Sequence, residues 1–533
     1  MHKYDATHIQ RLSKIGIALS VEKDINKLFT MIVREAKSLC NADAGTLYIV
    51  DEKKLHLEFA IVLNDSLMAG HGQATELKLP DVPLYLDGKP NYSNVSSLVA
   101  LTGESLNIPD IYQVQNNSSL SHLDFSGTRK YDRKTGYHTS SMLVIPMKNH
   151  EGSTIGVLQL LNAQDSESGQ IVPFSQEDEI LVASLASQAA VALNNVQLIR
   201  NLKDLFHAFI KSIATAIDEK SPYTGGHINR VVELTMMIAD AVNTDNKGRF
   251  RNIHFDENKK EELLIAAWMH DVGKITTPEH IMDKAGKLET IFDRMNLIEL
   301  RFAWIKEKIK NQYLQARLDL LEKGIQKTEV FKALDRQCSD MISQLKDDLE
   351  TIKQAGRPWE FLSEDRLEKI KKIGARKYRF GNDTYSVLTE DEQENLSVRM
   401  GTLTDRERRI IEHHAKMTYR ITSQLPFPDH LAHVPEYASQ HHEKPDGSGY
   451  PEGIQDDRLP LQSRILAVAD VFDALTAGDR PYKKPMKLSQ SIEILKSMKK
   501  DNHLDPDIVD IFLDKKIYRV YGEKHLDRDQ LDV

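Results

Sequence analysis

Histidine and carboxylate side chains recur in the second half of the chain in a pattern suited to metal binding. The densest group is His441-His442-Glu443, which leads directly into a turn rich in Gly, Asp and Pro at 444–451. A separate pair, His270-Asp271, follows an apolar run and precedes Gly273-Lys274. Histidine and carboxylate are ligands for catalytic metals of borderline or hard character. The pattern therefore predicts a metal-dependent reaction.

Further candidate ligands lie at the start of one predicted helix and inside two others. His227 begins a helix, where it can project into a shared cavity. His413 and His414 are neighbours on a second helix, and we expect one of them to face the site. Asp470 and Asp473 lie in a strongly apolar helical run, where a carboxylate is costly unless it is paired or metal-bound. Asp470 is the stronger ligand candidate, and Asp473, one turn later, is a candidate supporting residue.

The His270-Asp271 pair could serve two metals from one backbone position. Adjacent side chains on a helix differ in direction by about 100°, so the two residues can reach neighbouring ions. The carboxylate of Asp271 can also bridge two metals with its two oxygens. Lys274 then lies at the rim of the predicted site.

A helical insertion at 290–403 splits the candidate ligands into two groups. Two apolar runs with heptad spacing, separated by Gly324, predict a helical hairpin. The first run is Ile291, Met295, Ile298, Phe302, Ile305 and Ile309, and the second is Leu334, Cys338, Met341, Leu345, Leu349 and Ile352. The insertion could cover the mouth of the site or build a dimer contact.

The first 200 residues predict a separate α/β unit. Two strand candidates, 141–147 and 155–161, flank a short turn and suit an antiparallel pair. The following helix starts at Ser175, a good N-cap, with Asp178 three residues later.

This unit resembles a GAF domain, a small-molecule sensory fold. The resemblance rests on three patterns, Ser141-x-Leu143-x-x-Pro146-Met147, Gly156-Val157-Leu158-Gln159-Leu160-x-Asn162 and Phe174-Ser175-x-Glu177-Asp178-Glu179. Asn162, Phe174, Asp178 and Glu179 also match a signature of cyclic-nucleotide-binding GAF domains, but Ala163 stands where that signature has Lys. The resemblance implies an unidentified small-molecule ligand. The alternative is that these residues cap the helix and pack a dimer.

A heptad stripe joins the α/β unit to the His-rich region. Its members are Ile199, Leu202, Phe206, Phe209 and Ile213. We expect a parallel dimer helix that carries a signal between the domains, with a core-facing helix as the alternative.

Composition indicates a cytoplasmic protein that binds neither DNA nor membrane. The net charge of −9 provides no global basic field to attract nucleic acid or anionic lipid. The first residues lack the apolar core of a signal peptide, and no apolar run approaches the ~18 residues of a membrane span. Two cysteines, Cys40 and Cys338, argue against a disulfide framework.

The His-rich motifs resemble those of the HD-GYP family, a branch of the HD-domain metal phosphohydrolases. The matching motifs are Pro-Tyr-Thr-x-Gly-His at 222–227, His-Asp-x-Gly-Lys at 270–274, His-His-Glu…Asp-Gly-x-Gly-Tyr-Pro at 441–451, Ala-Val-Ala-Asp-Val-Phe-Asp-Ala-Leu at 467–475 and Asp-Arg-Pro-Tyr at 479–482. The resemblance implies an all-α domain that hydrolyses cyclic di-GMP to pGpG or GMP. The chain departs from the family at Ser221 and Tyr223, where Asp and a metal-binding Glu are usual. Asp218 and Glu219 are nearby alternatives for a third metal.

The family resemblance assigns a role to each motif residue. Two or three divalent ions, iron or manganese, are implied. One ion is held by His227, His270, Asp271 and Asp470, and Asp271 bridges to a second, which His414, His441 and His442 complete. Two metals about 3.5–4 Å apart can lower the pKa of a bridging water and neutralise phosphate oxygens. Asp271 and Lys274 are the implied catalytic residues, and Lys274, Tyr450, Arg480 and Lys484 the implied substrate contacts.

The sequence thus predicts a multi-domain chain, an α+β GAF domain followed by an all-α HD-GYP domain that carries a helical insertion. The predicted boundaries are 20–197 for the GAF domain, 198–215 for a signalling helix, 216–289 and 404–520 for the HD-GYP domain, and 290–403 for the insertion. We expect a homodimeric cyclic-dinucleotide phosphodiesterase regulated by its sensory domain. A receptor or interaction protein with little turnover, a preference for cyclic GMP-AMP, and a protein partner at the Gly-Tyr-Pro loop are the alternatives kept open.

Overall fold

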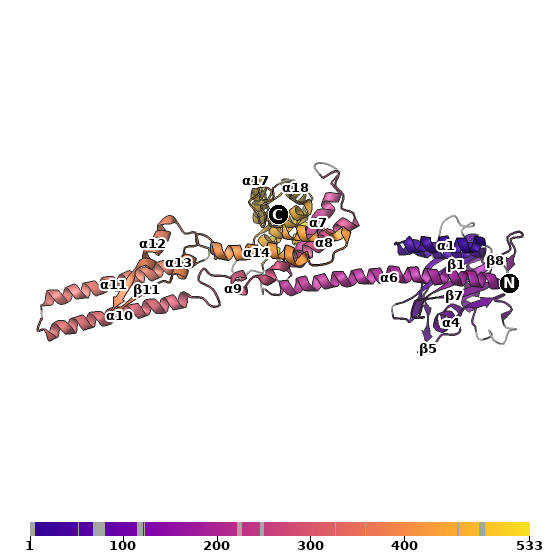
Figure 1. Ribbon diagram of the computed structural model, residues 1–533, viewed down its shortest axis with the longest axis horizontal. Coiled ribbons are helices and arrows are strands. Elements are labelled where there is room, and N and C mark those ends of the chain that lie inside the picture. Colours follow the sequence, from indigo (N-terminus) through magenta and orange to yellow (C-terminus); the bar gives the residue numbers. More distant parts are fainter. Residues whose placement is uncertain are drawn as a thin grey trace. The chain divides into compact units, whose positions relative to one another are not determined.

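The computed structural model describes residues 6–51, 53–67, 80–114, 121, 123–220, 226–245, 250–325, 327–357, 359–455, 458–478 and 485–533 (Figure 1). The chain divides into two compact units, Met1–Leu205 and Phe206–Val533. The division falls inside the predicted signalling helix. The finer domain boundaries stay predictions.

The first unit is built on an antiparallel sheet that has seven strands within the described residues. Its order is β3-β2-β1-β8-β7-β6, with β9 paired to β8. The strands are β1 (Ala42–Val50), β2 (His56–Asn64), β3 (Val82–Pro83), β6 (Leu106–Ile108), β7 (Met142–Lys148), β8 (Thr154–Gln164) and β9 (Ile171–Val172). The predicted antiparallel pair is present as β7 and β8, with Leu143 opposite Leu160. A two-stranded ribbon joins β4 (Tyr85–Leu86) to β5 (Lys89–Pro90).

Helices and loops cover the two faces of this sheet with separate apolar cores. The helices are α1 (Ala6–Val21), α2 (Ile25–Leu39), α4 (Val95–Thr102), α5 (Ser126–Thr135) and α6 (Gln176–Asp218). One core joins α2 and α6 to the sheet through residues such as Ile32, Leu158 and Leu185. The other lies around α4 and includes Val99 and Val144. The α+β class expected for this unit is confirmed.

The long helix α6 begins with the predicted cap. The Ser175 N–H donates to Asp178 Oδ2 at 2.8 Å, and the Asp178 N–H donates to Ser175 Oγ at 3.1 Å. Among the described helices, α6 alone is long and apolar enough to cross a membrane by length and composition. Leu185 and Ala189 within it are fully buried against the sheet, and a core helix of this kind meets the same criterion.

The second unit is largely helical. Its helices outside the insertion are α7 (His227–Asn243), α8 (Glu257–Met269), η2 (Val272–Thr276), α9 (Glu279–Met282), α14 (Asp405–Thr422), η3 (Asp429–Leu431), α15 (Val434–Ser439), α16 (Leu461–Thr476), α17 (Leu488–Lys500), α18 (Pro506–Asp514), α19 (Ile517–His525) and η5 (Arg528–Gln530). The apolar core gathers α7, α8, α16 and α18. Helix α16 contributes to the centre of this core, with Ile465, Val468 and Phe472 fully buried.

The insertion forms the predicted hairpin from α10 (Met295–Glu322) and α11 (Thr328–Ala355), visible in Figure 1. It continues through α12 (Glu364–Ala375), the ribbon β10 (Lys377–Phe380) and β11 (Asp383–Ser386), and α13 (Glu390–Leu396). Two predicted stripe members are wrong. Ile291 precedes the helix and is 90% exposed, and Ile342 rather than Met341 packs inward. Ile291 differs because the helix begins only at Met295, and Met341 differs because the inward face of α11 passes through its neighbour Ile342.

Two buried lysines tie the insertion to the rest of the unit. Lys284 Nζ lies 2.7 Å from Glu407 Oε2 on α14 and 2.6 Å from Asn395 Oδ1 on α13. Lys287 Nζ donates to the carbonyl of Val398 at 2.7 Å, and burial lowers the pKa of Lys287 to about 8. A buried ammonium group needs such partners, so these contacts fix both ends of the insertion.

Candidate metal centre

The structure brings the seven predicted ligands together from widely separated parts of the chain. Six of these residues form two groups, and within each group the possible ligand atoms lie within 4.8 Å of one another. One group is His227, His270 and Asp271, and the other is His414, His441 and His442. Asp470 joins the first group, because its Oδ1 lies 3.3 Å from Nε2 of His227. The ligands come from α7, the end of α8, α14, the turn after α15, and α16.

Asp271 lies between the two groups and turns one oxygen toward each. Its Oδ2 is 3.3 Å from His270 Nε2 and 3.7 Å from His227 Nε2. Its Oδ1 is 3.4 Å from His414 Nε2 and 3.9 Å from His441 Nε2. A carboxylate in this position can bridge two cations.

Close packing of η2 on α14 sets the position of Asp271. A Cβ on Gly273 would lie 2.0 Å from the carbonyl oxygen of His414, so glycine is required for this approach. Thr418 on α14 reinforces it, because its hydroxyl accepts the Gly273 N–H at 3.0 Å and donates to the carbonyl of His270 at 3.0 Å. The turn carrying Asp271 is thereby held against the helix carrying His414.

Three of the histidines are oriented by the same local hydrogen bond. Nδ1 of His270, His414 and His441 lies 2.8, 2.6 and 2.7 Å from the carbonyl oxygen three residues earlier. A carbonyl oxygen only accepts, so Nδ1 carries the hydrogen and Nε2 presents its lone pair. Metal-binding histidines usually have this arrangement, in which the ring nitrogen that does not face the metal donates a hydrogen bond.

The atoms left without hydrogen bonds point to a cation. Nε2 of His270, His414 and His441 and Oδ1 of Asp271 are buried and accept no hydrogen bond from any described residue. Buried polar atoms without partners are rare and costly. Nitrogen lone pairs and carboxylate oxygens facing a common space form a donor set that fits divalent metal ions.

Burial keeps most of these histidines neutral. It lowers the pKa of His414, lowers that of His441 well below its usual value, and lowers that of His442 to about 3. A neutral imidazole is the form that binds metal. Burial would raise the pKa of Asp271, but the charge of Lys274 and the neighbouring histidines hold it well below its usual range.

His227 differs because carboxylates contact both of its ring nitrogens. Its Nδ1 lies 2.7 Å from Asp473 Oδ2, and Asp470 lies at Nε2. Burial opposes protonation, but these hydrogen bonds and charges outweigh it and raise the pKa of His227 to about 10. A metal that binds at Nε2 must therefore displace a proton from His227. Asp473 is itself held by Arg230 Nε at 2.8 Å and by the Tyr521 hydroxyl at 2.6 Å. Asp473 therefore holds the His227 ring in this orientation, and its role in supporting a metal ligand stays a prediction.

Lys274 and Tyr450 lie at the edge of the cluster. Lys274 Nζ is 2.5 Å from Asp271 Oδ2 and the side chain is partly exposed. The Tyr450 ring centroid is 4.7 Å from that of His442 and 6.4 Å from that of His414. Both side chains are therefore close enough to contact a substrate bound at the cluster.

Glu443 holds the loop that carries Tyr450, a role that sequence analysis missed. Its side chain is buried, and its two oxygens accept the backbone N–H groups of Glu452, Gly453 and Ile454 at 2.6 to 3.1 Å. The available signal was a carboxylate directly after a histidine pair and before a glycine-rich turn.

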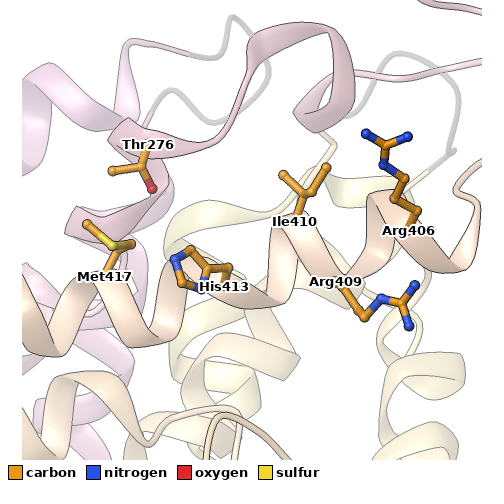
Figure 2. Close-up of a pocket in the computed structure, with 6 residues that line it drawn as sticks. All are labelled: Thr276, Arg406, Arg409, Ile410, His413 and Met417. Atoms are coloured by element: carbon orange, nitrogen blue, oxygen red, sulfur yellow. The ribbon is translucent and has the colours of Figure 1, made fainter.

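His413 and His414 lie in different environments, so only His414 is placed to act as a ligand at the cluster. His414 is 1% exposed within the cluster, whereas His413 is exposed and lines a neighbouring cavity of about 510 Å³. Figure 2 shows Met417, His413 and Ile410 in order along α14, with Thr276 on the facing segment and Arg406 and Arg409 both toward the start of α14. The structure thus directs His414, the residue preferred from sequence, toward Asp271.

The predicted substrate contacts Arg480 and Lys484 lie outside the described residues, as do Ser221 and Tyr223, where the sequence departs from the family pattern. Of the two alternatives for a third metal, Asp218 is buried and accepts the Gly226 N–H at 2.9 Å.

The residues shared with nucleotide-binding GAF signatures have structural contacts in the first unit. Asp178 caps α6, and Glu179 accepts a hydrogen bond from Ser105 at 2.7 Å. Asn162 Oδ1 accepts the Ser140 N–H at 2.7 Å, and Phe174 is buried in the core. These contacts match the capping and packing alternative.

Comparison with known proteins identifies both units. A GAF domain model matches residues 24–193, and two HD domain models match residues 224–334 and 391–508. The chain is 36% identical over 130 residues to a cyclic di-GMP phosphodiesterase of Thermotoga maritima, covering 24% of this chain and 34% of that protein. It is 38% identical over 120 residues to a 3'3'-cGAMP-specific phosphodiesterase of Vibrio cholerae, covering 22% and 27%. The matched segments thus span about a third or less of these relatives.

One solved structure that is similar to part of the chain is described as the GAF domain/HD domain protein from Geobacter sulfurreducens. It has a TM-score of 0.24 and 19% identity and covers 34% of this chain and 98% of that one. The two HD matches leave residues 335–390 of the insertion unmatched, and the GAF match covers most of the α+β unit. The chain therefore has one region that matches GAF domains, followed by two regions that match HD domains.

Proposed function

We propose that the chain is a metal-dependent phosphodiesterase that hydrolyses cyclic di-GMP to pGpG or GMP under control of its GAF domain. The observation that carries this proposal is the position of Asp271, with one oxygen toward His270 and the other toward His414 and His441, whose Nε2 atoms accept no hydrogen bond from any described residue. The names of the relatives, cyclic di-GMP and cGAMP phosphodiesterases, supply the substrate class.

Two divalent ions, iron or manganese, fit the donor set best in this proposal. His227, His270, Asp271 and Asp470 would hold one, and Asp271, His414, His441 and His442 the other. Bound metal supplies positive charge for the phosphate oxygens and lowers the pKa of a bound water. A third ion is less well supported, because Asp218 already accepts the Gly226 N–H.

The chain's own residues then divide the remaining work. A phosphodiester is anionic, so it must be held by positive charge before water can attack phosphorus and release the ribose 3′ oxygen. Lys274, partly exposed beside Asp271, is suited to bind a non-bridging phosphate oxygen. Tyr450, beside His442, can pack against the ribose or base. Asp473 keeps His227 oriented. Arg480 and Lys484 remain proposed contacts for the second phosphate or a base.

Regulation is proposed to pass through α6, which links the two units. Ile199, Leu202 and Phe209 of its heptad stripe are 61–71% exposed. Exposed apolar residues at this spacing favour a parallel dimer helix. A small-molecule ligand of the GAF domain, a protein partner at the Gly-Tyr-Pro loop and a cytoplasmic location complete the proposal.

The proposal is tested by reconstitution with Mn²⁺ or anaerobic Fe²⁺, followed by chromatography of cyclic di-GMP and its products. His414→Ala and His413→Ala form a matched pair on neighbouring positions of α14. We expect His414→Ala to lose metal, measured by elemental analysis, together with product formation, and His413→Ala to keep the metal. Binding of cyclic di-GMP without product under either metal would favour a receptor. A higher rate with cyclic GMP-AMP would reassign the substrate.

A further inference from the structure

The hairpin helix α10 presents a stripe of large apolar side chains that no described segment buries. The stripe lies on the face away from α11, and its apolar members are 39–66% exposed. They are Leu297, Leu300, Trp304, Leu314, Leu318 and Leu321. In the described part of α11, by comparison, Met341 is the one large apolar side chain with similar exposure. Contiguous apolar surface of this kind marks an interaction site.

The spacing of this stripe is that of a coiled coil. The positions 297, 300, 304, 307, 311, 314, 318 and 321 alternate steps of three and four residues, and only Glu307 and Asn311 in the middle are polar. The inward stripe, with Ile298, Phe302 and Ile305 buried against α11, lies about 150° around the helix from it at 100° per residue. These two stripes form separate apolar seams along α10. The inward seam packs against α11, whereas the outer one, called the open seam below, is not buried by any described segment.

One member of the open seam is partly covered. The Trp304 ring centroid is 4.6 Å from that of Tyr385 and 6.0 Å from that of Phe380, on the β10–β11 ribbon. Trp304 nevertheless remains 39% exposed, and Leu300 beside it is 66% exposed. The ribbon supports one edge of the seam and leaves the seam itself open.

We propose that α10 pairs with α10 of a second copy of this chain, antiparallel and centred on residue 309. In this register Leu297 meets Leu321 of the partner subunit, Leu300 meets Leu318 of the partner subunit and Trp304 meets Leu314 of the partner subunit. Glu307 meets Asn311 of the partner subunit. Every apolar position then faces an apolar position.

Glu307 and Asn311 favour this antiparallel register, and they favour a second copy of the chain as the partner that covers the open seam. Because Glu307 and Asn311 lie symmetrically about the centre, an antiparallel two-fold axis brings each carboxylate opposite a carboxamide, which can donate to it. A parallel pair in register would instead place Glu307 opposite another Glu307, with like charges facing each other. A polar residue at such a position is known to set register and orientation. Lys310 lies 2.6 Å from Glu307 and offsets its charge.

A self-complementary seam of this kind makes an isologous contact, in which the same patch is used on both copies. A lipid surface fits less well, because a carboxylate would lie at the centre of the buried face. The inference is independent of the proposed hydrolase activity, since none of these residues belongs to the metal centre.

The first test measures the native mass of the full chain by light scattering. In a Leu202→Lys background, which removes the proposed α6 contact, we expect Leu300→Lys combined with Leu318→Lys to halve the mass of the assembly, while circular dichroism stays unchanged. The control combines Phe361→Lys with Met400→Lys, which replace two exposed apolar residues of the same insertion outside α10. An unchanged mass in the α10 variant would overturn the proposal. The proposal would also be overturned if the chain stayed monomeric and bound anionic vesicles, and if the two α10 substitutions abolished that binding.

The second test fixes the register by cross-linking in a Cys338→Ser background. Leu300→Cys with Leu318→Cys should form an intermolecular disulfide under mild oxidation, because the two positions face each other in the antiparallel pair. Leu300→Cys alone should not, since the two copies of position 300 would be 18 residues, or about 27 Å, apart along the helices. Cross-linking by the single variant would indicate a parallel pair and contradict the proposed arrangement.

Discussion

His227 and Asp473 are 246 residues apart in the chain, yet Nδ1 of the histidine lies 2.7 Å from Oδ2 of the aspartate. The carboxylate is completely buried and is also bound by Arg230 and Tyr521. The His227 ring is therefore held with Nε2 toward Asp470 and Asp271. This relationship ties the metal centre to the core of the helical unit.

Removing the charge that orients His227 should weaken metal binding without removing a ligand. We expect Asp473→Asn to reduce metal affinity about 10–100-fold, the usual effect of losing such a supporting hydrogen bond. Competition with a chelating dye measures the affinity. Asp340→Asn, an exposed aspartate on α11, is the control and should bind metal like the wild type. Equal affinity in Asp473→Asn would show that His227 needs no such support.

Packing of η2 on α14 predicts a large effect from one added methyl group. Gly273→Ala would place a Cβ 2.0 Å from the His414 carbonyl oxygen, so the two segments must separate. Overpacking of this kind costs about 1–3 kcal/mol or more. We expect a lower melting temperature and weaker metal binding. In Gly286→Ala the nearest atom lies 3.8 Å from the new Cβ, and no change is expected there.

The buried pair between Lys284 and Glu407 should anchor the insertion. Lys284→Met leaves the Glu407 carboxylate without its ammonium partner, and breaking a buried ion pair costs about 3–5 kcal/mol. We expect faster limited proteolysis near residues 284–290 and 395–403. The control is Lys372→Met, which breaks an exposed pair with Glu368 and should cost at most about 1 kcal/mol. Equal protease resistance in the two variants would contradict the assignment.

The same pair predicts a dependence of stability on pH. Burial would raise the pKa of Glu407, but hydrogen bonds and charge from Lys284 outweigh it and hold the pKa below its usual value of 4.5. A lowered carboxylate pKa stabilises the fold fully above 4.5, and this contribution is lost as the pH falls below 4.5 through the folded-state pKa. The melting temperature of the wild type should therefore fall more steeply with acid than that of Lys284→Met. If the melting temperatures of the two proteins fell equally with decreasing pH, the ion pair would not be the source of this pH dependence.

Glu443 should control the order of the loop that carries Tyr450. Glu443→Gln removes one of the two oxygens that accept the backbone N–H groups of residues 452–454. We expect faster amide hydrogen exchange at these three residues, because their N–H groups lose a charged acceptor. Glu452→Gln changes an exposed side chain in the same loop and should leave exchange unchanged. Unaltered exchange in Glu443→Gln would remove this role.

Much of the local structure follows from sequence alone, because its causes are local. The Ser175 and Asp178 cap, the β7 and β8 pair and the inward seam of α10 arise from hydrogen-bonding residues at helix starts and from apolar spacing. The ligand types were likewise readable, since His and Asp residues inside apolar runs have few structural uses.

Only tertiary packing decided which oxygen of Asp271 faces which histidines, that Glu443 holds the Tyr450 loop, and that α10 leaves its outer seam open. Each depends on segments distant in sequence meeting at one place, as Gly273 meets His414. Spacing along a helix indicates which side chains share a face but not what that face packs against. The sequence by itself therefore determined the candidate ligands and most of the helices, and packing between distant segments determined their arrangement.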